Sequence, residues 1–479
     1  MRSISVGLEK QWAAAIAANK TGAPGEMRSI SMMKATDLAA KTPITRLRYL
    51  DAFRASAMLT VVIGHWLIMT VANVDGEIIG FSILPNVPGL WPLTWVFQVM
   101  PLFFLVGGIA GALSWSRWRN RGGGIAGWLL GRLSRLMTPA LVVLGLAVIG
   151  ALIAVHFGVS QRLVQQAVDA VTMPMWFLVV YLLLILVTPG MYWLHLKFGW
   201  RVIAVMIMVV IVGDTIRIAA ENQYFAYLNH ALAWLIPYQV GFAWQDGTLK
   251  MTKTKAWIWL AIGLISMILL TIPGPYPISM IGFGGHHLVN TSPPTVALLA
   301  LTIFQIGVAW LLAQPVQRLM ERYQKLWAIV IAINSVTMTI FVWHMVAALA
   351  GALLLNSFDS LPFWFIGTGN WGNPQWWLGR LPWFATLIPI LALLVLIFGP
   401  LESRTQLRSG KTPTTIEKPH LNGTGLTLAV ICCYLILAGG LYWMASSPPG
   451  FHGPAVIATG ALALVAAGTA IFQILRSIT

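Results

Sequence analysis

The chain has 479 residues, of which 58% are apolar and 9% are charged, and its formal net charge is +16. Soluble globular proteins carry about a quarter charged residues, so this composition excludes a soluble globular chain. A basic excess would suggest nucleic-acid binding in a soluble protein. In a membrane protein it is instead expected on cytoplasmic loops, and we predict a lipid bilayer and no nucleic acid as a partner.

Apolar blocks of about twenty residues recur along the chain, which is the length needed to cross a hydrocarbon core of about 30 Å. The blocks are continuous rather than alternating, so they predict helices and not barrel strands. The predicted class is all-α: a polytopic helical membrane protein with about twelve transmembrane helices. The predicted spans are residues 50–73, 93–115, 137–156, 175–195, 201–219, 228–244, 256–273, 295–314, 328–355, 383–401, 424–444 and 454–475.

The charges of the loops predict the orientation of these spans. With the N-terminus in the cytoplasm, inner segments hold 26 of the 30 Lys and Arg residues, and outer segments hold only Arg162, Arg217 and Arg380. A missed or invented span would scramble this alternation, so the bias supports both the span count and the orientation. We expect a multi-pass protein of the cell (inner) membrane with N and C termini cytoplasmic.

Composition also divides the chain into four predicted parts. Residues 1–46 are polar to mixed and predict a mobile cytoplasmic arm. Residues 47–404 hold ten spans. Residues 405–423, polar and interrupted by Pro and Gly, predict a cytoplasmic linker. Residues 424–479 predict a C-terminal helix pair that is almost free of ionisable side chains.

The first span carries polar residues that are costly in a membrane and therefore indicate function. Asp51 and Arg54 are three residues apart and can pair on one helical face; alternatively they anchor the helix at the interface, where Arg can extend to water. His65 lies eleven residues beyond Arg54, about 16 Å along the axis and on the same face. That depth is too great for an interface anchor, so His65 is the leading candidate catalytic residue, and Asp51 and Arg54 are candidates beside it.

Arg132 and Arg135 precede Pro139 near the inner end of the third span. Two guanidiniums on adjacent helical positions would suit a phosphate-bearing ligand at the inner surface. The alternative is ordinary positive-inside charge. Farther along the chain, Asp214 and Arg217 at the end of the fifth span predict a local ion pair.

The outer segment 274–294 has no charge and many aromatic, amide and hydroxyl groups, as sugar-binding surfaces do, and His287 and Asn290 are its candidate substrate-binding residues. The Trp-rich segment 371–377 offers stacking surfaces or an interfacial aromatic belt. The adjacent His286 and His287 have no nearby carboxylate or cysteine, so we predict no metal site.

Several motifs occur in a fixed order along residues 46–404. They are Leu50-Asp51-x-x-Arg54 followed by His65, Pro101-x-Phe103-Phe104-x-x-x-Gly108, Arg132-x-x-Arg135, Trp176-Phe177-Leu178 with Tyr181, Ser335 to Thr339 leading to Trp343-His344, and Glu402. This ordered set resembles the acyltransferase-3 family of membrane acyltransferases. Two features depart from the family pattern: Trp343, where Leu or Ile is frequent, and the extra helix pair after residue 423.

The resemblance implies transfer of an acyl group, usually acetyl, from acyl-CoA to an acceptor such as a sugar or glycolipid hydroxyl of the cell envelope. Acyl-CoA would be a co-substrate, and no cofactor would be bound permanently. The resemblance also implies that His344 supports the catalytic site and that Glu402 contributes at the cofactor end. It implies that Trp176 and Tyr181 contact substrate.

The chemistry of the residues agrees with this reading. A neutral histidine suits a general base or an acyl carrier, the role expected of His65. Arg54, Arg132 and Arg135 could hold the anionic end of coenzyme A while its pantetheine arm extends toward His65. A twelve-helix secondary transporter or lipid-sugar flippase is the alternative, but residues 240–479 hold no second copy of the Arg-x10-His pattern. A non-catalytic scaffold would leave Arg54 and His65 unexplained. The sequence does not indicate an oligomeric state.

Overall fold

The computed structural model describes residues 42–43, 46–74, 77–282, 288–356, 372–410, 423–446 and 458–478. Most of the predicted N-terminal arm lies outside these residues, as does 411–422 of the predicted linker. Helix α16 continues to Gly410, into the first part of that linker segment.

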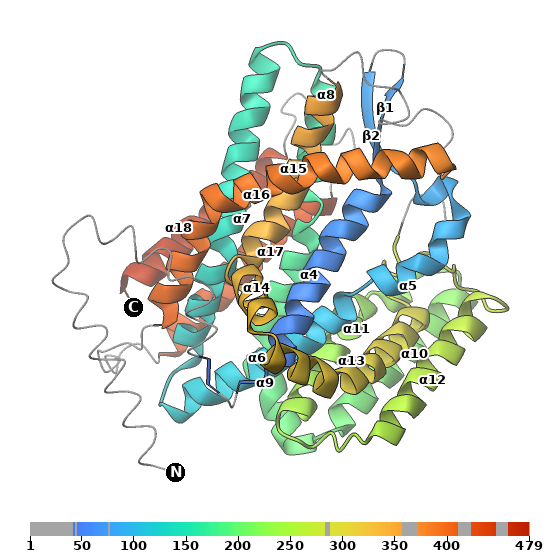
Figure 1. Ribbon diagram of the computed structural model, residues 1–479. Coiled ribbons are helices and arrows are strands. Elements are labelled where there is room, and N and C mark those ends of the chain that lie inside the picture. The colour runs from blue at the N-terminus through green and yellow to red at the C-terminus, as the bar shows by residue number, and fades with distance from the viewer. Residues whose placement is uncertain are drawn as a thin grey trace.

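The described residues are almost entirely helical (Figure 1). The helices are α4 (Arg48–Ile68), α5 (Thr94–Phe97), α6 (Met100–Asn120), α7 (Ile125–His156), α8 (Gln161–Thr172), α9 (Met175–Phe198), α10 (Arg201–Ala219), α11 (Asn229–Gln245), α12 (Lys253–Thr271), α13 (Val296–Arg322), α14 (Gln324–Ser335), α15 (Thr337–Asn356), α16 (Pro374–Gly410), α17 (Thr424–Ser446) and α18 (Thr459–Ile478). Two strands, β1 (Met69–Val74) and β2 (Glu77–Ser82), form a hairpin.

Ten helices of the described chain are long and apolar enough to cross a membrane, so the prediction of a helical multi-pass membrane protein is confirmed. They are α6, α7, α9, α10, α12, α13, α15, α16, α17 and α18. The first and sixth predicted spans form helices α4 and α11, which do not meet the same criteria. Helix α11 has 17 residues, and α4 carries Arg48, Asp51 and Arg54. The count of twelve spans stays a prediction.

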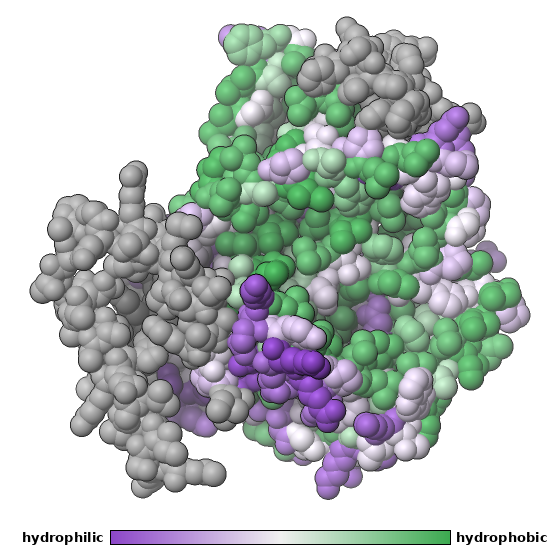
Figure 2. Space-filling view, in the orientation of Figure 1, coloured by the Kyte–Doolittle hydropathy of each residue, from purple (hydrophilic) through white to green (hydrophobic). Residues whose placement is uncertain are grey.

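The outer surface of the helices is apolar. Large side chains such as Leu152 of α7, Leu269 of α12 and Leu396 of α16 are exposed. In Figure 2 hydrophobic residues cover the middle of the face shown, and hydrophilic residues gather below them around the junction of α13 and α14. An apolar surface of this extent fits contact with lipid tails.

Helix α4 has one basic end and one end at the hairpin. Its first turn follows Arg46 and includes Arg48, and its last residue, Ile68, leads directly into β1. Helix α7 begins near Arg121 and likewise runs toward the hairpin, where α8 packs against β2 (Figure 1). We call these two ends of the molecule the arginine end and the hairpin end.

The hairpin shortens the first predicted span, which ends at Ile68 and not at residue 73. Met69 lies opposite Ser82 and Val74 lies opposite Glu77. The physical reason is local: β-branched residues favour strands, and the sequence between the strands is Asp75-Gly76, a preferred two-residue turn.

Close packing of α6 against α11 brings the core together. A Cβ on Gly108 would overlap the carbonyl of Tyr238, and one on Gly241 would meet the backbone of Leu105 at 2.5 Å. Gly107 and Gly111 are four residues apart, a spacing typical of close helix packing, and both face α11 or α9. Small residues let these two backbones touch, as in membrane helix pairs generally.

The C-terminal helix pair is part of the packed core. Helix α17 packs on α7, α9 and α18. Its Tyr434 is fully buried and donates a hydrogen bond to the carbonyl of Leu129 at 2.8 Å. Leu129 lies one turn before Arg132. The C-terminal helix pair therefore supports the part of α7 that carries Arg132 and Arg135.

Candidate active site

Two histidines from helices far apart in sequence meet inside the helix bundle. Nδ1 of His65 on α4 lies 2.8 Å from Nε2 of His344 on α15. The rings are nearly parallel, with 12° between their planes and 5.1 Å between centroids. The two nitrogens are closer than the ~3.5 Å of van der Waals contact between ring faces, so the rings meet edge to edge through a hydrogen bond.

The hydrogen bonds of His344 determine which nitrogen of each ring carries a proton. Nδ1 of His344 lies 2.5 Å from the carbonyl oxygen of Phe341, which can only accept, so Nδ1 donates. His344 is fully buried, and among the described residues no carboxylate pairs with either ring. A neutral His344 then accepts at Nε2, and Nδ1 of His65 donates to it. In a neutral His65 that donates from Nδ1, the lone pair is at Nε2, which this hydrogen bond leaves available.

Two tryptophans fix the helices that carry these rings. The indole N–H of Trp66 donates to the carbonyl of His344 at 2.9 Å. The indole N–H of Trp383 on α16 donates to the carbonyl of Trp66 at 3.0 Å. Trp343 stacks on Phe398 of α16 with centroids 4.1 Å apart, which gives this departure from the family pattern a packing role. Helices α4, α15 and α16 are therefore held in one register around the histidines.

Arg54 lies at the arginine end of the same face of α4. Its Nε donates to the side-chain oxygen of Asn334 on α14 at 2.6 Å, and its terminal nitrogen lies 3.6 Å from Asp51. Asn334 in turn donates to the carbonyl of Asp51 at 2.8 Å. Asp51 also pairs with Arg46 at 2.8 Å. The predicted Asp51–Arg54 pair is thus present, and Asn334 holds it in place.

Glu402 of α16 caps α15. It is buried, and its two carboxylate oxygens accept from the backbone N–H groups of Met338 and Thr339 and from the Thr339 hydroxyl. A carboxylate at a helix N-terminus is favourable because it meets unpaired N–H groups and the positive end of the helix dipole. These contacts give Glu402 the task of positioning the helix that carries His344.

Arg132 and Arg135 lie on the third turn of α7. The guanidinium of Arg132 lies over the ring of Trp128, with 5.5 Å to the centroid. Nε of Arg135 is buried without a hydrogen-bond partner. Within the described part of the chain neither arginine pairs with a carboxylate. Two adjacent cations without an acidic partner suit a polyanionic ligand.

Trp176 and Tyr181 of α9 belong to an aromatic cluster that reaches the histidines. Tyr181 stacks on Phe177 with centroids 5.9 Å apart, and Phe177 meets Phe341 of α15 edge to face at 5.0 Å. Phe341 is the residue whose carbonyl faces His344. Both Trp176 and Tyr181 are partly buried, so they form a wall beside the histidine pair.

The candidate residues of the loop after α12 lie elsewhere. Asn290 is buried, and its amide donates to the carbonyls of Pro277 and Ser279 and accepts from Thr295. Its polar atoms are used to shape the loop. His287 lies outside the described residues. Among the described residues no three His, Cys, Asp or Glu side chains gather closely enough to hold a metal ion.

The predicted Asp214–Arg217 pair is confirmed, with 2.6 Å between its charged atoms. Asp214 is fully buried and accepts from the hydroxyl of Tyr276 and the backbone of Val296. Burial and the hydrogen bond to Asp214 raise the pKa of the Tyr276 hydroxyl, so it remains a donor. The pair fastens the loop to α10 and α13.

A family model described as an acyltransferase domain, Acyl_transf_3, matches residues 47–399, from α4 into α16. The chain belongs to the acyltransferase-3 family. No curated protein and no solved structure matches it. The matched range contains His65, His344 and both α7 arginines of this membrane acyltransferase, whereas α17 and α18 lie outside it.

Asn334 is the residue of this acyltransferase site that sequence reasoning missed. It stands in the last turn of α14, directly after the apolar run Leu326–Ile333, and is 8% exposed. A buried amide is costly unless it is hydrogen-bonded. An amide next to an apolar run of residues therefore indicates a specific partner, and this is the sequence signal that marks Asn334.

Proposed function

We propose that this acyltransferase moves an acyl group, acetyl in the simplest case, from cytosolic acyl-CoA to a hydroxyl of an envelope sugar or glycolipid. The single observation that carries this proposal is the 2.8 Å contact between Nδ1 of His65 and Nε2 of His344, because it leaves Nε2 of His65 outside the hydrogen bond between the rings. A buried imidazole with a fixed tautomer is the group needed to take a proton from a hydroxyl or to attack a thioester.

As a general base, Nε2 of His65 removes the proton of the acceptor hydroxyl, and the oxygen attacks the carbonyl carbon of the thioester. The carbon–sulfur bond breaks, and the leaving thiolate takes the proton from Nε2. During the step Nδ1 of the charged His65 still donates to His344, so the charge is spread toward a fixed dipole. The ester product and free CoA account for all atoms.

As an acyl carrier, Nε2 of His65 attacks the thioester first, and CoA leaves as the thiolate. The acceptor hydroxyl then attacks the acyl group and displaces the neutral imidazole, and the proton lost by the hydroxyl balances the one that the CoA thiolate takes up from water. The two routes use the same atom. Mass spectrometry of the protein after acetyl-CoA is added without acceptor separates them, because only the carrier route leaves an acetyl group on His65.

The unpaired cations of α7 support binding of the nucleotide phosphates at the arginine end, which we propose faces the cytoplasm. Arg132 lies on the third turn of α7 and Arg54 on the second turn of α4. His65 lies about 16 Å beyond Arg54 along α4. An extended pantetheine arm bridges such an offset, so the phosphates and the thioester would occupy different depths.

The test uses the purified full-length protein in lipid nanodiscs with radiolabelled acetyl-CoA and an extract of envelope glycolipids. We expect label to enter the glycolipid fraction and to be released by mild alkali, as an ester is. If wild-type protein neither transfers the label nor releases CoA, the proposed function is wrong.

A further inference from the structure

A buried arginine lies at the hairpin end, away from the cations considered above. Arg380 of α16 is 5% exposed, and its NH1 donates to the carbonyl of Met69 at 2.9 Å. Its guanidinium lies over the rings of Trp376 and Trp383, with 4.2 and 5.6 Å to the centroids. No carboxylate within the described ranges forms an ion pair with it.

Two hydrogen-bond donors in this cluster lack acceptors. Nε of Arg380 is buried without a partner, and so is the indole N–H of Trp376, one turn earlier on α16. A buried donor without an acceptor costs about 1–3 kcal/mol, and more when it is charged. Anchoring the hairpin needs one donor, so it does not account for a buried cation with unused N–H groups.

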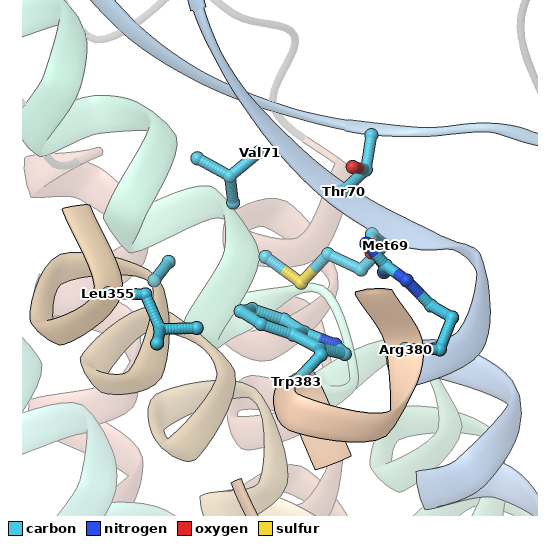
Figure 3. A pocket seen from close by; sticks show the side chains of 7 residues that line it. Met69, Thr70, Val71, Leu355, Arg380 and Trp383 are labelled. Carbon is cyan, nitrogen blue, oxygen red and sulfur yellow. The ribbon is translucent and has the colours of Figure 1, made fainter. Parts of the chain in front are cut away.

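A small pocket lies beside the guanidinium (Figure 3). Arg380 and Trp383 come from α16 and Leu355 from α15, and the other lining residues are Met69, Thr70, Val71 and Ala352. Figure 3 shows Trp383 next to Met69, with Leu355 facing them from another helix. The pocket encloses about 10 Å³, room for an atom the size of an oxygen, so it admits an anionic oxygen of a ligand rather than a whole sugar ring.

The pocket lies one turn beyond the catalytic histidine. Met69 follows His65 by four residues, about 6 Å along the helix direction. Trp383, which lines the pocket, donates to the carbonyl of Trp66, the neighbour of His65. When the charged group of a ligand reaches the pocket, the ligand atoms a few ångströms from that group would lie next to the side of His65 that faces the hairpin.

We propose that Arg380 binds an anionic group of the acceptor, a phosphate or carboxylate, and that the acceptor is therefore an acidic glycolipid or glycosyl phosphate. The proposal rests on the proposed function for the identity of the ligand as acceptor. A guanidinium gives charge-assisted hydrogen bonds to either anion. The rings of Trp376 and Trp383 hold the guanidinium in place through cation–π contact.

Binding of matched probes tests this assignment without requiring turnover. The protein is placed in nanodiscs of phosphatidylcholine, and binding of octyl glucoside, octyl glucuronide and octyl glucosyl phosphate is measured. We expect at least one anionic probe to bind about tenfold more tightly than the neutral one. Arg380→Gln should remove that difference, and Arg380→Lys should keep part of it. The phosphate and carboxylate arms show which anion is preferred.

Arg162→Gln is the matched control, because it removes an exposed arginine of α8 that does not line the pocket. Equal binding of the three probes to wild type, or unchanged anion preference in Arg380→Gln, would overturn the proposal. Competition by phosphatidylglycerol as strong as by the glucosyl phosphate would also overturn it, since the occupant would then be bulk lipid.

Binding of acetyl-CoA separates this proposal from the proposed function. If Arg380→Gln binds acetyl-CoA as tightly as wild type, the variant is folded and the donor side is intact. A wild-type protein that binds the anionic probes but releases no CoA even with the glycolipid extract present would contradict acyl transfer and leave the anion site standing.

Discussion

At the scale of single residues, the hydrogen bonds of His344 decide the chemistry available to His65. A carbonyl acceptor at Nδ1 of His344 forces the lone pair to its Nε2, and that lone pair orients the proton of His65. In the proposed mechanism His344 acts through its neighbour and is a positioning residue, not one that touches the reacting atoms.

This role predicts a difference between two substitutions of His344. The amide oxygen of His344→Gln can still accept from Nδ1 of His65, whereas His344→Ala offers no acceptor. We expect His344→Ala to lower kcat for acetyl transfer by about 100-fold and His344→Gln to lower it less. KM for acetyl-CoA should stay within a factor of about two, since the arginines are untouched.

Steady-state kinetics of both variants in nanodiscs check this expectation. Equal losses in the two variants would point to packing rather than to proton orientation. A rise in KM for acetyl-CoA without a fall in kcat would show that His344 contributes to donor binding and not to proton orientation.

The sequence predicts part of this site for a clear physical reason. Arg54 and His65 stand out because a polar group in an apolar helix is costly. The ordered motifs imply only that His344 supports the site, and its contact with His65 could not be predicted, because residues 279 positions apart give no local signal of contact. Arg380 was counted among the outer arginines, and its burial depends on the rings of α16 and the carbonyl of Met69.

At the scale of helices and loops, backbone contact between α6 and α11 holds the aromatic wall near the histidines. Gly108→Ala should lower the free energy of unfolding by about 1–3 kcal/mol, because a Cβ there overlaps the carbonyl of Tyr238. Gly145→Ala on α7 is the control, since its Cβ would meet nothing within 4 Å.

Thermal unfolding in detergent measures both glycine variants. A Gly108→Ala protein as stable as wild type would mean that the helices can separate slightly without loss. That result would weaken the assignment of α6 and α11 as a rigid support for the site.

The loop after α12 depends on one buried carboxylate. Removing one member of a buried ion pair costs about 3–5 kcal/mol because it leaves an uncompensated charge, so Asp214→Asn should destabilise the protein by about that amount. Glu221→Gln removes an exposed carboxylate two turns later and should change stability by less than about 0.5 kcal/mol. Similar unfolding temperatures for the two variants would contradict the role of Asp214.

Most helices could be predicted from continuous apolar blocks, and the Asp214–Arg217 pair from its spacing. The hairpin could not, because its strands are as apolar as the end of a span, and only Asp75-Gly76 marks the turn. Helix α8 was missed because it is amphipathic and packs beside the hairpin rather than crossing the core. Local sequence patterns predict whether a segment forms a helix or a strand, but they do not predict which other segment it packs against.

At the scale of the whole molecule, the site is divided along the bundle. Cations without acidic partners lie near the start of α7, the histidines lie deeper, and Arg380 lies toward the hairpin. We therefore expect the arginine end to bind the phosphates of the donor and the middle of the bundle to carry out the acyl transfer.

Two donors separate these roles. S-acetylpantetheine carries the same thioester as acetyl-CoA but lacks its phosphates. Replacing Arg132 or Arg135 by Gln should raise KM for acetyl-CoA about tenfold and leave kcat/KM for S-acetylpantetheine nearly unchanged. Equal effects on both donors would show that the α7 arginines stabilise the fold instead of binding phosphate.

The most direct test of the account is the initial rate of labelled acetyl transfer from acetyl-CoA by His65→Ala, compared with wild type in the same nanodiscs. The account predicts a loss of at least about 100-fold in a variant that unfolds at nearly the wild-type temperature. Transfer by a folded His65→Ala protein at the wild-type rate would contradict it.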